Sequence, residues 1–281
     1  MSLATGFLWT YKTHRLLGYS VAGLSTSLVF PEADVCFDVA QGLPFQMGTS
    51  NLLISHAHMD HAAGIPYVVA MKSMTGAAKP TFYMPESLLE PMHAIMAAWA
   101  KAESHAYDYR FEAARDGVEY SLKGGYCFKP FTTSHRVPSQ GYTVFEKRKR
   151  LKPELAGLAR GELMEIKRQG GALEDYSQDP LISFTGDTRI EFLDMAPHVA
   201  LSKILVMEVT FFDDQKSVEN ARHWGHIHLE ELLPRLDSIR SERIVLIHAS
   251  ARYTSKQLKA ILDDRIPEQH KTRVQLFPRP I

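Results

Sequence analysis

Four side chains that can bind a metal ion fall within six residues of this chain, in the segment 55–61. The segment follows residues 51–54, a short apolar run that predicts a buried strand. If the turn stays extended, the alternate residues His56 and His58 point the same way and can reach one ion. Asp60 and His61 lie one step further and can reach a second ion. Packing does not call for such a polar cluster, so the segment predicts a metal site rather than a chance run of surface histidines.

Three more polar residues each follow a run that predicts a strand. His135 comes just after an apolar and aromatic stretch, Asp187 follows residues 181–184 and a glycine turn, and His248 ends the run 244–247. The loop ends of strands present side chains to a crevice at the edge of a sheet. Taken alone, each of the three could equally be a hydrogen-bonded core residue.

The segment 55–61 resembles the HxHxDH signature of the metallo-β-lactamase superfamily, in which a third histidine, a bridging aspartate and a last histidine follow in that order. The three residues above have the right types and the right order. The resemblance therefore implies one ion held by His56, His58 and His135, a second held by Asp60, His61 and His248, and Asp187 as the bridge between them.

Imidazole and carboxylate ligands without cysteine suit zinc, and also manganese or iron. We expect two zinc ions, with manganese or iron as the alternatives. Two ions about 3.5–4 Å apart can lower the pKa of a water towards 7 and stabilise both oxygens of an in-line displacement. The expected chemistry is hydrolytic and well matched to a phosphodiester.

Five other short segments resemble those of ribonuclease Z, the endonuclease that removes 3′ trailers from precursor tRNA. VMEVTF (residues 206–211) resembles its HEATF-type segment, GHIHL (225–229) its GHST-type segment and HASARY (248–253) its HFSxRY ending. The remaining two segments are SQGY (139–142) and the early FD (37–38). The resemblance runs from about residue 18 to residue 253 and is closest to the short, single-domain form of the family.

This resemblance implies an α/β fold, the αβ/βα sandwich of two mixed sheets flanked by helices, in a single domain over residues 1–281. Apolar periodicity agrees with it. Strand runs fill residues 16–54, with turns expected at Gly18, Gly23 and Gly42. Further strands are expected at 81–84, 181–184, 204–209 and 244–248, and helices at about 62–74, 86–103, 228–240 and 254–263.

The family also has a glutamate and a histidine outside the metal shell, beside the leaving group. Carried over, Glu208 orients and charges His226, and His226 protonates the departing 3′ oxygen, because a carboxylate partner raises the pKa of an imidazole and fixes its tautomer. Two alternatives stay open: Glu208 could pair with a lysine or arginine, and His228 could take the place of His226. Asp60 has a double assignment, as a metal ligand and as a proton acceptor from the attacking water.

Two features could contact an RNA substrate. A basic run, Lys147, Arg148, Lys149 and Arg150, opens an insertion at about 146–180, where many bacterial members carry a glycine- and proline-rich arm that grips tRNA. This stretch lacks that composition, so it is either a phosphate-binding segment or a solvated edge. Arg252, four residues after a metal ligand, could hold a phosphate by bidentate bonds or simply face solvent.

Composition sets the outer limits. The chain has 281 residues, 45% of them hydrophobic, and a net formal charge of zero, so RNA would have to be held by local patches and the ions. Its two cysteines lie in apolar contexts and indicate free thiols in a reducing compartment. No signal peptide or membrane-spanning stretch is evident. We expect a cytoplasmic protein without a membrane partner, and the resemblance suggests a homodimer.

These observations predict a dinuclear metal-dependent phosphodiesterase of ribonuclease Z type, with precursor tRNA as its substrate. The alternative is a hydrolase of the same fold that acts on small phosphodiesters or sulfate esters, resembling a cyclic-nucleotide phosphodiesterase or an arylsulfatase. A third hypothesis, a non-catalytic RNA-binding relative, is disfavoured by the complete set of ligands.

Overall fold

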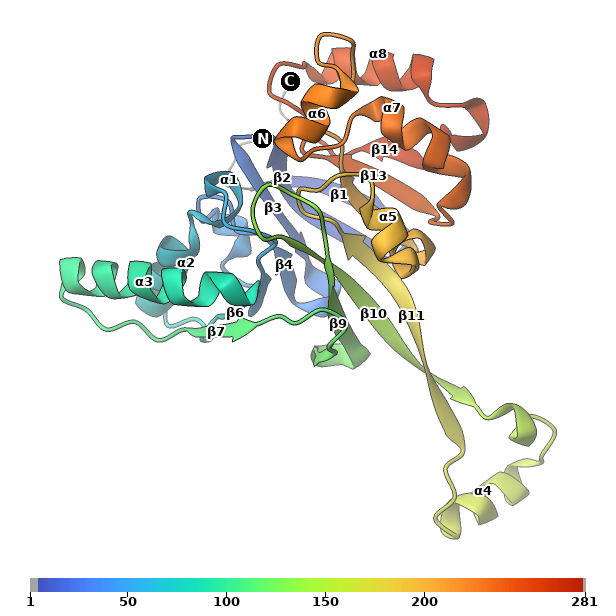
Figure 1. Cartoon of the computed structure of the whole chain (residues 1–281). Helices are drawn as coiled ribbons and strands as arrows, with labels where there is room; N and C mark the ends of the chain where they lie inside the picture. The colour runs from blue at the N-terminus through green and yellow to red at the C-terminus, as the bar shows by residue number, and fades with distance from the viewer. Residues whose placement is uncertain (1–4, 280–281) are drawn as a thin grey trace.

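Seven strands from residues 7–113 form one sheet, and seven strands from residues 120–276 form another (Figure 1). The computed structural model describes residues 5–279, apart from the side chains of residues 149, 150 and 176. Each sheet joins antiparallel strands to parallel ones, so both sheets are mixed, as the sequence predicts.

The first sheet has the strand order β1-β2-β3-β4-β5-β6-β7, antiparallel up to β4 and parallel from β4 onward. Its strands are β1 (Phe7–Tyr11), β2 (His14–Val21), β3 (Ser25–Phe30), β4 (Val35–Phe37), β5 (Asn51–Leu53), β6 (Thr81–Met84) and β7 (Arg110–Ala113). The parallel strands β4 and β5 are short and almost entirely buried, as is typical of strands covered on both faces, whereas the edge strand β7 is partly exposed.

The second sheet has the order β14-β13-β12-β11-β10-β9-β8, with β8 to β11 antiparallel and β11 to β14 parallel. Its strands are β8 (Tyr120–Ser121), β9 (Tyr126–Thr132), β10 (Gln140–Leu151), β11 (Glu174–Phe184), β12 (Ile204–Glu208), β13 (Arg243–Ile247) and β14 (Val274–Leu276).

The described α-helices are α1 (Met59–Ala62), α2 (Ile65–Thr75), α3 (Leu89–Glu103), α4 (Arg160–Arg168), α5 (Phe192–Met195), α6 (Val218–Trp224), α7 (Leu229–Leu232) and α8 (Ser255–Arg265). Helix α4 lies in the connection between β10 and β11, away from both sheets, and the others lie against the body of the molecule (Figure 1). One core cluster joins the first sheet to α2 and α3, and another joins the second sheet to α5, α7 and α8. A third lies between the sheets, where the rings of Phe37 and Phe184 stack at 4.9 Å. These four layers are the predicted αβ/βα sandwich.

Most predicted elements are confirmed, and the differences have physical causes. No turn occurs at Gly18, which lies inside β2 opposite Leu28. A Cβ there would stand 2.1 Å from the carbonyl oxygen of Ser27, so the glycine allows close approach of two strands. The helix expected at about 228–240 is α7 followed by a 3₁₀ helix, Leu233–Ser238, because Pro234 interrupts the α-helical hydrogen bonds.

A long hairpin leaves the body of the molecule (Figure 1). Strands β10 and β11 continue beyond their neighbours in the sheet, and the connection between them contains α4 (Figure 1). We call residues 146–180 the arm. The sequence predicted only the last residues of β11, because its outer part is polar and has no buried face to give an apolar pattern.

Within residues 5–279, no helix combines the length and the hydropathy needed to cross a membrane.

Candidate metal centre

Segments that follow the ends of strands bring the predicted metal ligands together. His56 and His58 follow β5, Asp60 and His61 lie on α1, and the other three follow strands of the second sheet: His135 after β9, Asp187 after β11 and His248 after β13. The cluster therefore lies at the shared edge of the two sheets, where strand ends open onto a crevice.

The seven side chains form two groups that could each hold an ion. Within each group the candidate ligand atoms lie within 4.8 Å of one another. One group contains His56, His58, His135 and Asp187, and the other contains Asp60, His61 and His248. Asp187 Oδ2 lies 3.4 Å from His61 Nε2 and 3.3 Å from His248 Nε2, so this carboxylate reaches both groups.

Two buried polar atoms in the cluster have no hydrogen-bond partner among the described residues. They are Nε2 of His56, whose side chain is fully buried, and Oδ1 of Asp187. An unpaired polar atom in a protein interior costs free energy. A cation between these two atoms would satisfy both, so the residues fit a metal cofactor.

In the first half of the chain, hydrogen bonds turn the ligand imidazoles toward the cluster. The Asp38 carboxylate accepts from Nδ1 of His61 at 2.7 Å and from the Ser55 hydroxyl at 2.7 Å. His56 Nδ1 donates to that Ser55 oxygen at 2.9 Å. Both histidines therefore keep the lone pair of Nε2 for a metal, as in other metal sites where a second partner fixes the tautomer.

Hydrogen bonds to Nδ1 also orient the ligand histidines that follow strands of the second sheet. Nδ1 of His135 donates to the carbonyl oxygen of Gly225 at 2.8 Å, and Nδ1 of His248 donates to the hydroxyl of Thr210 at 3.0 Å. Gly225 has φ +81°, and a Cβ there would lie 2.7 Å from His135 Nδ1. Only glycine fits beside this ligand. His248 itself has φ +59°, an uncommon conformation that points to strain held by the site.

Sequence reasoning missed three residues that orient ligands: Asp38, Ser55 and Thr210. Asp38 is fully buried and has φ +53°. It belongs to the FD segment identified from the sequence, but nothing in that segment says that its carboxylate reaches His61, 23 positions away. The only available signals were that Ser55 is adjacent to His56 and that Thr210 lies two positions after Glu208.

Burial lowers the pKa of His56, His58 and His135, and for His56 it does so strongly. Neutral imidazole is the form that binds a metal. Burial alone would raise the pKa of Asp187, but the positive charges of His248 and His61 outweigh it and hold that pKa well below its usual range. The first ligand group thus combines three neutral imidazoles with an ionised carboxylate, whereas Asp187 and Asp38 overcome burial and raise the pKa of His61 well above its usual range.

Glu208 and His226 lie beside this cluster and contact each other. Glu208 Oε1 accepts from His226 Nδ1 at 2.9 Å. The carboxylate is fully buried and also accepts from the backbone N–H of Thr188 and Ile227 and from the Thr210 hydroxyl. Burial works against the charged form of His226, but Glu208 and Asp187 overcome it and raise the pKa of His226 to about 9.

The described contacts of Glu208 and of His228 bear on the two alternatives left open for this pair. None of the described hydrogen bonds or ion pairs of Glu208 involves a lysine or arginine. His228 is buried and caps α7: its Nδ1 accepts from the N–H of Glu230, and its Nε2 donates to the carbonyl of Asp213. Both ring nitrogens of His228 are thus used away from the metal ligands.

The predicted substrate contacts lie further out. Lys147 pairs with Glu119 at 2.6 Å, and Arg148 pairs with Glu146 at 2.7 Å, so carboxylates partly neutralise the start of the basic run. The side chains of Lys149 and Arg150 lie outside the described part of the chain. Arg252 is exposed; its guanidinium lies 5.9 Å from the ring of Tyr253, next to it in the chain.

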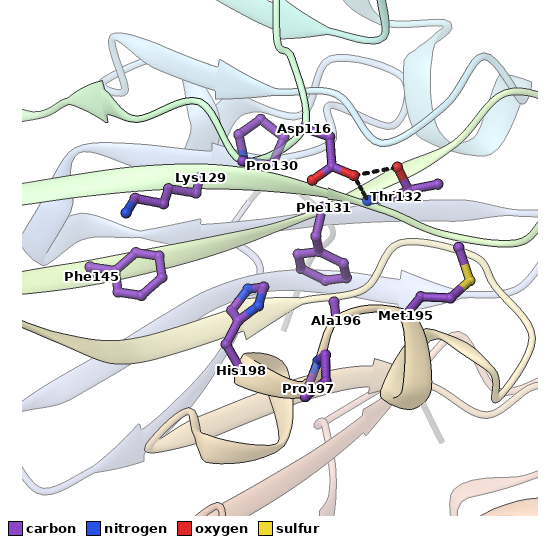
Figure 2. A pocket seen from close by; sticks show the side chains of 11 residues that line it. Asp116, Lys129, Pro130, Phe131, Thr132, Phe145, Met195, Ala196, Pro197 and His198 are labelled. Atoms are coloured by element: carbon purple, nitrogen blue, oxygen red, sulfur yellow. Dashed lines mark hydrogen bonds between the residues drawn. The ribbon is translucent and has the colours of Figure 1, made fainter.

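One cavity opens at the site, and a second lies next to the first. One, of about 600 Å³, is lined by His135 and the residues around it, including Thr132, Arg136 and Met195. The other, of about 440 Å³, shares Thr132 and Met195 with it and contains none of the metal-ligand candidates. Figure 2 shows this second cavity, with the rings of Phe131, Phe145 and His198 and the Asp116 carboxylate bonded to Thr132.

Comparison with known proteins gives the same family from independent evidence. The family model of the beta-lactamase superfamily domain matches residues 36–249. The chain is 35% identical over 255 residues to tRNase Z TRZ1 of Arabidopsis thaliana, covering 88% of this chain and 91% of the relative. It is 31% identical over 269 residues to the chloroplastic tRNase Z TRZ2 of the same plant, covering 95% and 75%.

A solved structure of human tRNase Z, short form, superposes with a TM-score of 0.58 at 18% identity, over 99% of this chain and 98% of that one. Fold and site thus define a metal-dependent hydrolase of the metallo-β-lactamase superfamily. Within that superfamily, the chain belongs to the ribonuclease Z (tRNase Z) family.

Proposed function

We propose that this protein is an endoribonuclease that cleaves precursor tRNA after its last retained nucleotide and removes the 3′ trailer. The observation that carries the proposal is the contact between Glu208 and His226 at 2.9 Å, beside a cluster of seven metal-ligand candidates. A phosphodiesterase needs an acid for its leaving oxygen, and this pair supplies one next to the metal site.

We assign the ligands in two sets. His56, His58 and His135 hold one ion, Asp60, His61 and His248 hold the other, and Asp187 bridges them. Zinc suits these donors best, with manganese or iron as alternatives. When bound, the ions act as Lewis acids and lower the pKa of water, so that hydrolysis can proceed at neutral pH.

The protein's own groups then move the protons. Water adds to phosphorus, the bond from phosphorus to the 3′ oxygen breaks, and His226 gives its proton to that oxygen, which leaves as a hydroxyl. Nδ1 of His226 is held by Glu208, so Nε2 is the nitrogen that donates. Asp60, which accepts a hydrogen bond from the N–H of Gly23, also accepts the proton of the attacking water.

Substrate contacts outside the metal site are proposed on geometry and charge. Arg252 is exposed four residues after His248 and can bind a phosphate near the ions. The arm, with Lys147, Arg148, Lys149 and Arg150 at its base, reaches away from the body and can contact the RNA at a distance from the cut (Figure 1). The arm and the sandwich form one domain over residues 1–281.

A homodimer would cover an apolar face on α2 and α3. Tyr67, Met74, Ile95 and Trp99 are 51%, 73%, 40% and 49% exposed, and Tyr67 and Trp99 line one cavity together. Large exposed apolar patches mark interaction surfaces. We also place the protein in the cytoplasm, a reducing compartment, because both cysteines are buried free thiols.

The decisive experiment is cleavage of a 3′-extended precursor tRNA with added zinc or manganese, beside a small chromogenic phosphodiester. A single cut at the trailer junction that leaves a 3′ hydroxyl, lost in His58→Ala and slowed in His226→Ala, is the expected result. Turnover of the small diester with the tRNA left intact would overturn the proposed substrate and favour the small-diester alternative.

A further inference from the structure

The rim of the metal site carries an exposed aromatic ring with a cation on it. Trp224 ends α6 and is 50% exposed, and the Arg136 guanidinium lies 5.1 Å from the centre of its ring. These residues come from different parts of the chain. Arg136 follows the ligand candidate His135, and Trp224 stands two residues before the proposed acid His226.

The pair is held firmly in place. A capping box at Ser217 begins α6, and Gly225 ends it in the left-handed conformation, where His226 N–H bonds back to the carbonyl of Ala221 at 2.9 Å. This ending fixes the direction of the chain from Trp224 to His226. The helix end thus positions the ring and the proposed acid as one unit.

Arg189 joins the two segments that carry the pair. Its Nε donates to the carbonyl of Arg222 on α6 at 2.8 Å, and its Nη1 donates to the Ser134 hydroxyl at 3.0 Å, just before His135 and Arg136. His135 also bonds to Gly225. Three hydrogen bonds therefore tie the loop of Arg136 to the end of the helix that carries Trp224.

The pair makes few other contacts: the Trp224 ring meets the ring of the adjacent His223 edge-on at 5.6 Å. Across residues 5–279 the Arg136 side chain has no ion pair or hydrogen bond; its described contact is the Trp224 ring. Structural tryptophans are normally well buried, whereas this one leaves half of its surface to solvent. A flat exposed ring backed by a cation is the arrangement that takes a nucleobase by stacking, whatever the base.

We propose that Trp224 and Arg136 form a stacking platform for one unpaired nucleobase, that of the nucleotide bearing the leaving 3′ oxygen. The choice of nucleotide rests on the proposed function, in which His226 protonates that oxygen. A stacking surface discriminates weakly between bases, so it places the last retained nucleotide without restricting which base it carries.

The test uses precursor tRNAs that are intact or abasic at that nucleotide. Trp224→Ala lowers kcat/KM for the intact precursor by roughly five- to a hundredfold, the range seen when stacked aromatic residues are removed. With the abasic precursor, wild type and Trp224→Ala cleave equally. Trp224→Phe keeps most of the activity. As a matched control, Arg243→Ala removes the guanidinium that lies 4.1 Å from Tyr11, at the opposite end of β13 from His248, and leaves both rates unchanged.

Binding gives a second measurement that does not depend on cleavage. The chain has three tryptophans, and the product tRNA should quench the fluorescence of wild type but much less that of Trp224→Phe. Quenching without any trailer cleavage would retain the platform while the proposed function failed. Equal losses on intact and abasic precursors, unchanged cleavage in Trp224→Ala, or a changed oligomeric state in that variant would each overturn the platform.

Discussion

The metal-site edge and the arm treat their charged side chains in opposite ways. At the edge, the carboxylates of Asp38, Asp187 and Glu208 are buried, and each has a histidine within reach. On the arm, eight lysine or arginine residues stand among seven aspartate or glutamate residues. The described ion pairs there are largely exposed, so each contributes little to stability.

This difference indicates that the metal-site edge carries out the chemistry and that the arm contacts distant parts of the substrate. Buried side chains that are held by several hydrogen bonds keep the geometry that catalysis needs. The arm instead extends away from the body and has a nearly neutral surface. Changes at the edge should therefore affect every substrate. Changes in the arm should affect only substrates long enough to touch it.

The largest effect is expected at the bridge between the two ligand groups. Asp187→Asn keeps the shape of the side chain and removes its charge, so it should weaken ion binding and slow cleavage of both RNA and a small diester by roughly a thousandfold. Metal content by atomic emission and rates on both substrates measure this. A loss confined to RNA would contradict the assignment of Asp187 to the metal centre.

The proposed acid pair should come next. His226→Ala should lower kcat for RNA by about a hundredfold or more. In wild type, His226 is protonated below its pKa of about 9, and activity should be lost as the pH rises through that value. Glu208→Gln removes the charge that raises this pKa, so its alkaline loss of activity should begin at lower pH. An alkaline limb at the same pH in both proteins would rule out this role for Glu208.

An intermediate effect is expected for Asp38, which touches a ligand but no ion. Asp38→Asn should weaken ion affinity roughly ten- to a hundredfold, because His61 loses the acceptor that fixes its tautomer. Competition with a chelating dye measures the affinity. Asp194→Asn is the matched control: Asp194 is an exposed partner of Arg235 on the surface and should leave the affinity unchanged.

The smallest effect should come from shortening the arm. Replacing residues 152–173 by Asn-Gly closes β10 onto β11 with a favoured hairpin turn. KM for precursor tRNA should rise about tenfold, as lost phosphate contacts weaken salt-dependent binding, while the ratio of RNA to small-diester cleavage falls. An unchanged KM would assign tRNA binding to the body alone and remove the contrast between the two regions.

Sequence reasoning reached the ligand groups because strand ends and histidine spacing are local features. His56, His58 and His248 each follow an apolar run, and the family order supplied the rest. Asp38 was missed as a partner of His61 because that contact joins two loops through the fold. The positive φ of Asp38 cannot be predicted from the residue type either.

The arm shows the converse failure. Its composition differs from the glycine- and proline-rich pattern of many bacterial relatives, so the basic run predicted an insertion at about 146–180 but not a projecting hairpin. What builds it is the long pairing of β10 with β11, from Tyr142 opposite Phe184 to Leu151 opposite Glu174, with one shift of register between Val144 and Phe145. Strand pairing of this length depends on backbone register, which polar sequences specify weakly.

The division of strands between the two halves of the chain has a consequence for biosynthesis. All strands of the first sheet are encoded before residue 114, and they carry His56, His58, Asp60 and His61. The other ligand candidates arrive later, the last of them at position 248. When the ribosome has synthesised the first sheet, it has thus made only part of each ion-binding group. One group is complete only after residue 187 and the other only after residue 248, so both ions bind late in translation.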